Sequence, residues 1–133
     1  MKLIRDDVLA AMDSSFDSIP GLSDKYNLAF VNDARTGRSL KNYIILTERA
    51  ELFAARGITA EEVFWSRYFW FLRFVNLRQA MHGSDAGLEQ QAFQILEYPY
   101  PDCAPDWSSL ESVTMAVDTE VRAELQQPAG DAV

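Results

Sequence analysis

The residues of this chain best suited to chemistry are three basic side chains in one short segment. Arg35, Arg38 and Lys41 lie around Gly37 in the sequence ARTGRSLK. Arginine and lysine donate charged hydrogen bonds to phosphate and carboxylate oxygens, and a glycine-containing turn can present backbone N–H groups to an anion. These three residues are therefore the candidate anion-binding site. The competing interpretation, an ordinary solvated loop, is favoured by charge patterning alone.

Metal and nucleophile chemistry are poorly supported. The chain has one histidine, His82, and one cysteine, Cys103, whereas a zinc site needs several such ligands close together. Cys103 lies in an acidic, proline-rich segment without a basic neighbour that would favour its thiolate. The spacing motifs of metalloproteases, serine hydrolases, P-loop proteins and dinucleotide-binding proteins do not occur. We therefore expect no catalytic residues, no metal and no cofactor.

The strongest feature of the sequence is an aromatic segment, VFWSRYFWFLRFV at 63–75, which holds seven of the sixteen aromatic residues. A helix that is apolar nearly all round is normally buried at the centre of a fold. The alternative is that one side of it contacts a partner, because Trp, Tyr and Arg dominate protein interfaces. The candidate contact residues on this helix are Trp65, Phe69 and Arg73. Tyr98, Tyr100 and Trp107 are candidates for a second, aromatic and proline-rich contact surface.

The aromatic segment belongs to a helix predicted at about 60–82. Thr59 and Glu62 form a capping-box pattern at its start, and Gly83 follows its end. Shorter helices are predicted at 3–12, at 47–57 and at 87–97. A last helix should begin at Asp106 or Ser108, with a narrow apolar stripe. The residues of that stripe are Trp107, Leu110, Val113, Val117, Val121 and Leu125.

Residues 26–46 fit two structures. Tyr26, Leu28 and Phe30 alternate as in a strand, and 43–46 could return as its partner in a β-hairpin. A helix from about Leu40 through Ala55 fits the same residues. The predicted fold is mainly α, a single compact domain of about five helices around the helix at 60–82. It spans residues 1–127, and 128–133 form a flexible tail.

The charge is unevenly distributed along the chain. The net charge is −8, but residues 35–78 sum to +4 and residues 79–133 to −9. The two parts can attract each other within one fold, or the acidic part can meet a basic partner. A signal peptide and a membrane-spanning segment are not predicted, and a single cysteine suits a reducing compartment. We therefore expect a cytoplasmic protein that does not bind membranes or nucleic acid directly.

These features favour a non-enzymatic protein that binds another protein, or itself as a homo-oligomer. Adaptors, assembly factors, chaperones and inhibitors are of this kind, and phage and mobile elements encode many small acidic proteins of the sort. One alternative is an acidic inhibitor that mimics nucleic acid. Another is a small ligand-binding domain or metal-independent enzyme that uses Arg35, Arg38, Tyr43 or Glu48 around a pocket.

Overall fold

The computed structural model describes residues 2–26, 28–83 and 107–126, and within these ranges the chain is mainly helical, without a β-strand. The predicted mainly α class is therefore confirmed for the described residues. The helical elements, in chain order, are α1 (Asp6–Ala11), η1 (Asp13–Ser18), α2 (Leu22–Lys25), η2 (Leu28–Asn32), α3 (Gly37–Glu48), α4 (Ala50–Ala54), α5 (Ala60–His82) and α7 (Trp107–Gln126).

The β-hairpin predicted within 26–46 is wrong. The 3₁₀ helix η2 and the helix α3 occupy this region. The reason lies at Asp33, whose Oδ1 accepts hydrogen bonds from the backbone N–H groups of Arg35 and Thr36, at 2.8 and 2.9 Å. An acidic side chain that satisfies the free N–H groups before a helix favours helix initiation over an extended strand.

The alternative of a helix from Leu40 through Ala55 is closer to the structure, but the helix is interrupted. α3 ends at Glu48, and Arg49 leaves helical geometry, with φ −127° and ψ 36°, before α4 begins. The turn after α4 closes at Gly57, whose φ of +80° is a conformation that favours glycine. The helix predicted at 47–57 is thus divided by a break at Arg49 that propensity alone did not indicate.

A close approach of two backbones fixes the start of α3. A Cβ atom at Gly37 would lie 2.2 Å from the carbonyl oxygen of Val31. No side chain can occupy that space, so only glycine lets η2 fold back onto the first turn of α3. The glycine that the sequence associated with anion binding is therefore required by packing.

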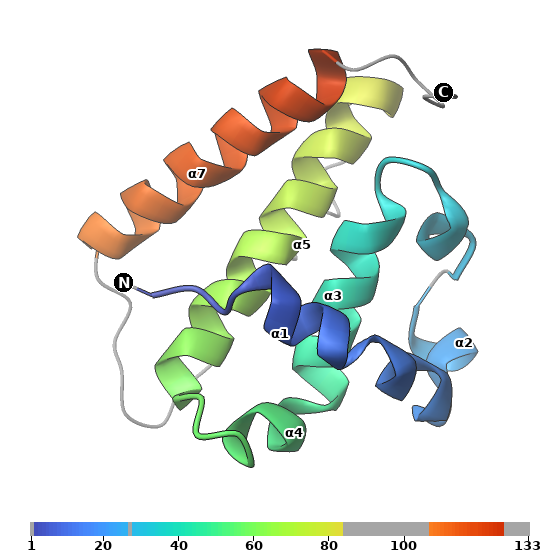
Figure 1. The fold of residues 1–133 in the computed structure, drawn as a ribbon. Helices are drawn as coiled ribbons and strands as arrows, with labels where there is room; N and C mark the ends of the chain where they lie inside the picture. The colour runs from blue at the N-terminus through green and yellow to red at the C-terminus, as the bar shows by residue number, and fades with distance from the viewer. Residues whose placement is uncertain (1, 27, 84–106, 127–133) are drawn as a thin grey trace.

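Helix α5 begins at the cap that the sequence indicates. The Thr59 hydroxyl accepts a hydrogen bond from the N–H of Glu62 and donates one to its carboxylate, both at 3.2 Å. The helix runs to His82 and is followed by Gly83, with φ +86°. Figure 1 shows α5 between α3 and α7. Most of its apolar side chains are buried, namely Val63, Phe64, Trp65, Tyr68, Phe69, Trp70, Phe71, Phe74, Val75 and Leu77.

The N-terminal segment joins this core through a long-range hydrogen bond. The backbone N–H of Ile4 donates to the buried Ser66 hydroxyl of α5 at 2.8 Å. Figure 1 shows the segment and α1 crossing in front of α5 and α3. Burial of Ile4 and Leu9 closes this side of the core.

Some predictions fall on residues outside the described ranges. These are the helix at 87–97, the Cys103 segment and the tail at 128–133. Among the described residues, no helix is both long enough and apolar enough to cross a membrane.

Candidate functional site

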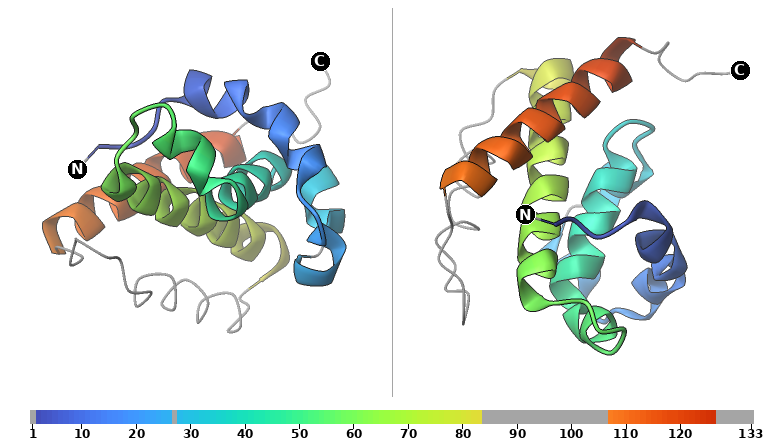
Figure 2. Two further views of the ribbon diagram at one scale, coloured as in Figure 1. Left: turned by 90° about the horizontal axis from the view of Figure 1, so that it is seen from below. Right: turned by 60° about the vertical axis from the view of Figure 1, so that its left-hand side comes forward.

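The C-terminal helix α7 packs against α5 along one narrow stripe. Val113, Val117 and Val121 are buried, as the sequence pattern predicts. Leu125, the next residue in the series, is 37% exposed. A spacing of four residues exceeds the 3.6-residue turn, so each step moves the stripe further around the helix. Figure 2 shows α7 crossing α5, with one side of α7 facing away from the other helices.

Five exposed residues form one continuous side of α7 beside the buried valine stripe, with Leu125 at the boundary, and we call them the α7 outer face. They are Glu111, Met115, Asp118, Arg122 and Leu125, each separated by three or four positions from the next. Met115 is 70% exposed, and it and Leu125 are the large apolar side chains that remain exposed among the described residues. Asp118 and Arg122 form an ion pair of 3.0 Å between them. The face therefore presents two apolar side chains, about 15 Å apart along the axis, with charges around them.

The structure places the predicted contact residues Trp65 and Phe69 in the core. Their side chains are 2% and 4% exposed. The Trp65 ring lies edge-on to Phe64 at 5.1 Å, and Phe69 lies edge-on to Trp70 at 5.2 Å. A partner cannot reach either ring unless the core opens. Both side chains are buried because the neighbouring helices and the N-terminal segment supply enough apolar surface to cover them, and their role as partner contacts stays a prediction.

Arg73, the third predicted contact residue on α5, is bonded within the chain. Its guanidinium lies 3.2 Å from Glu120 and 3.7 Å from Glu124, both on α7, and donates to the Ser39 hydroxyl of α3. It also lies 5.6 Å from the centre of the Trp70 ring. The side chain is only 12% exposed. Arg73 therefore links three helices and offers little surface to a partner.

The second predicted contact surface is not described. Tyr98 and Tyr100 lie outside the described residues. Trp107 is the first residue of α7, but its side chain also lies outside the described part. Their role as partner contacts stays a prediction.

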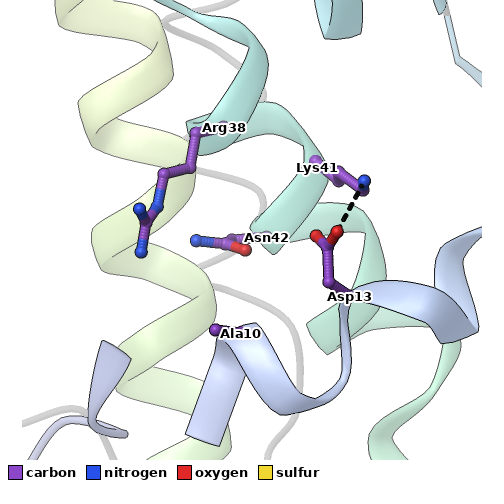
Figure 3. Close-up of a pocket in the computed structure, with 5 residues that line it drawn as sticks. All are labelled: Ala10, Asp13, Arg38, Lys41 and Asn42. Atoms are coloured by element: carbon purple, nitrogen blue, oxygen red, sulfur yellow. Dashed lines mark hydrogen bonds and ion pairs between the residues drawn. The ribbon is translucent and has the colours of Figure 1, made fainter. Parts of the chain in front are cut away.

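The three basic residues of the predicted anion site divide into a pair and a separate residue. Arg38 and Lys41 are three positions apart on α3 and line one hollow, together with Asn42, whereas Arg35 precedes the helix and is not part of that lining. The Lys41 ammonium pairs with Asp13 of η1 at 3.1 Å. Figure 3 shows this pair on one side of the hollow and Arg38 on the other.

The other residues considered for a ligand pocket have partners elsewhere. Glu48 accepts hydrogen bonds from Lys25 and Tyr26, at 3.0 and 2.9 Å, and the ring of Tyr43 packs on Phe71 at 4.8 Å. Burial and the bond to Glu48 raise the pKa of Tyr26 well above its ordinary value. Desolvation alone would raise the pKa of Glu48, but the bonds from Lys25 and Tyr26 outweigh it and lower that pKa. This arrangement stabilises the fold and keeps the phenol protonated.

Sequence reasoning missed Met115 on α7 and both Asp13 and Asn42 in the hollow. A helical wheel of 107–126 places Met115 opposite the valines, so that signal was available. The position of Asp13 beside Lys41 depends on how η1 packs against α3, which no local pattern encodes.

Among the described residues, no group of three or more His, Cys, Asp or Glu side chains could hold a metal ion. No protein family model, no curated protein and no solved structure matches this chain.

Proposed function

We propose that this chain is a non-enzymatic interaction protein that binds a partner protein through the α7 outer face. The observation that carries the proposal is the exposure of Met115 and Leu125 on one side of a helix whose other side is already packed. An exposed methionine on an amphipathic helix is a common anchor for a groove in another protein. The partner should therefore present an apolar groove that accepts these two side chains.

Charge adds a second property of the partner. α7 contains four acidic residues and one basic residue, and residues 79–133 carry much of the negative charge of the chain. A groove with basic residues at its edges would attract this helix and orient it. A standard stable interface buries about 800 Å² on each partner and involves roughly 20–30 residues a side, more than the α7 outer face supplies, so a reversible contact is expected. Adaptor, chaperone, assembly and inhibitor roles all fit such a contact.

The alternative of a nucleic-acid mimic gains no support from α7. Three of its four carboxylates are paired with arginines of this chain: Glu120 and Glu124 with Arg73, and Asp118 with Arg122. A mimic needs regularly spaced negative charges that are available to the partner.

The test is a pull-down from nuclease-treated host lysate with the wild-type chain and with Met115→Glu. Ala54→Glu is the matched control, because it adds the same charge at another exposed helical position. One stoichiometric protein should be captured by the wild type and by Ala54→Glu, and lost with Met115→Glu. Light scattering measures the molar mass of the purified chain and so shows whether its partner is a second copy of itself. If Met115→Glu captures the same protein, or if nothing is captured and the chain is monomeric, the proposal fails.

A further inference from the structure

A hollow beside α3 has the donors of a small anion site. It has a volume of about 320 Å³ and lies between α1, η1 and α3. Its lining residues are Ala10, Asp13, Arg38, Lys41 and Asn42. The volume is at the lower end of the range for small-molecule sites. The last three residues lie at positions i, i+3 and i+4 of one helix and therefore share a face.

Asn42 supplies the observation that points to a ligand. Its side chain is 5% exposed, and its Nδ2 is buried without a hydrogen-bond acceptor in the structure. A buried amide donor without an acceptor is unfavourable and rare, so an acceptor is expected at this position. Figure 3 shows the amide nitrogen of Asn42 extending toward the side of the hollow where the Arg38 guanidinium lies.

Arg38 supplies the charge. The guanidinium makes no hydrogen bond or ion pair with the described part of the chain, and it lies 5.9 Å from the centre of the buried Trp70 ring. Contact with an aromatic face favours a defined position for a guanidinium while its N–H donors stay available. Two donors, one charged and one neutral, thus line the same hollow.

The remaining charges limit what can bind. Lys41 is paired with Asp13 and lies 5.1 Å from the centre of the Phe16 ring, so this pair contributes no net charge to the hollow. Arg38 leaves it with a net charge of +1, whereas Asp13 would repel a large polyanion. The negative charge of the whole chain opposes anion binding only weakly at physiological ionic strength, where screening acts over about 8 Å.

We propose that this hollow binds a small oxyanion, a carboxylate or phosphate group, between the Arg38 guanidinium and the Asn42 amide. The site lies on α3 and is independent of the α7 outer face. It replaces the predicted triad of Arg35, Arg38 and Lys41 with a different pair of donors. Planar guanidinium groups bind both carboxylate and phosphate through paired hydrogen bonds, so one geometry serves both sources.

The experiment is an amide-detected NMR titration of the ¹⁵N-labelled full chain, at constant ionic strength, with inorganic phosphate in one arm and sodium acetate in the other. Saturable shifts are expected at residues 38–42 and at the side-chain NH₂ of Asn42, with a dissociation constant on the order of millimolar. Saturation with either anion supports the site and identifies which group it prefers. Linear shifts with both anions, up to about 50 mM, would overturn it.

Matched variants separate this site from general charge effects. Arg38→Gln removes the charge and should weaken binding roughly tenfold or more. Arg56→Gln removes another exposed arginine, one that lines a different hollow with Asp7, Val8, Ala11 and Ile58, and should leave binding unchanged. Both positions are exposed, so both variants should fold, which circular dichroism verifies. Equal weakening by the two variants would show a non-specific charge effect and overturn the proposal.

Discussion

Arg73 of α5 and Glu120 of α7 form an ion pair of 3.2 Å across the interface between the two helices. The same guanidinium reaches Ser39 of α3, so a single side chain joins three segments that are far apart in the sequence. One basic residue of the positively charged part, 35–78, thus meets two acidic residues of the negatively charged part, 79–133. Internal attraction therefore accounts for part of the charge asymmetry, and the α7 outer face is a part of α7 that stays exposed.

Replacing Arg73 should loosen α7. Arg73→Ala removes the partner of two carboxylates and of the Ser39 hydroxyl, and we expect a loss of about 1–3 kcal/mol in the free energy of unfolding, measured in urea. Arg122→Ala is the control, since its ion pair with Asp118 is exposed and lies within one helix. That change should cost less than about 0.5 kcal/mol. Equal losses in the two variants would contradict the role assigned to Arg73.

Truncation of Trp65 should lower stability, whereas truncation of Met115 should weaken partner capture. Trp65→Ala removes a buried ring and should destabilise the fold by about 3–5 kcal/mol. Met115→Ala removes an exposed side chain and should change stability by no more than about 0.5 kcal/mol, while weakening partner capture. Thermal unfolding and the pull-down measure the two effects separately. A Trp65 variant of wild-type stability would return that residue to the list of surface contacts.

Gly37 should not accept even the smallest side chain. In Gly37→Ala the new methyl group would overlap the Val31 carbonyl oxygen, so η2 would have to move away from α3. We expect a loss of about 2 kcal/mol or more in the free energy of unfolding. At Gly21, by contrast, a Cβ meets no atom within 4 Å, and Gly21→Ala meets only the strain of a φ of +70°. That strain should cost about 1 kcal/mol, and a larger loss at Gly21 than at Gly37 would refute the steric argument.

The cluster around Glu48 should make stability depend on pH at both ends of the scale. Because the folded pKa of Glu48 is lowered below its ordinary 4.5, its bonds stabilise the fold at neutral pH and are lost as the pH falls through the lower value. The stability difference between wild type and Glu48→Gln should therefore shrink in acid. The raised pKa of Tyr26 acts in the other direction, so its contribution falls as the pH rises above about 10. Urea midpoints across the pH range measure both trends, and a difference that stays constant in acid would contradict the first.

Local signals predicted the helices α5 and α7 but not the contacts between helices. The cap at Thr59 and the valine stripe of α7 follow from spacing alone, and both are present in the structure. The hairpin within 26–46 was wrong: Leu28 and Phe30 lie in η2, and the Asp33 side chain satisfies the N–H groups of Arg35 and Thr36 in the turn that leads into α3.

The candidate sites were harder to predict than the helices. The aromatic content of the sequence indicated a surface that binds a partner. Whether an aromatic side chain is buried, however, depends on which segments pack against its ring. Trp65 and Phe69 look like contact residues in a sequence and are core residues in the fold. The hollow beside Arg38 also needs Asp13, which approaches it only after η1 and α3 have packed together.

The hydrogen bond between Ile4 and Ser66 has a consequence for the order of assembly. The two residues are 62 positions apart, so the start of the chain has no place to attach until α5 has been synthesised. At typical translation rates that interval is roughly 3 to 12 s. Until α5 has been synthesised, apolar residues such as Leu9 have no complete core to pack against. The nascent chain therefore remains open to chaperones at its N-terminus while its later helices are still being made.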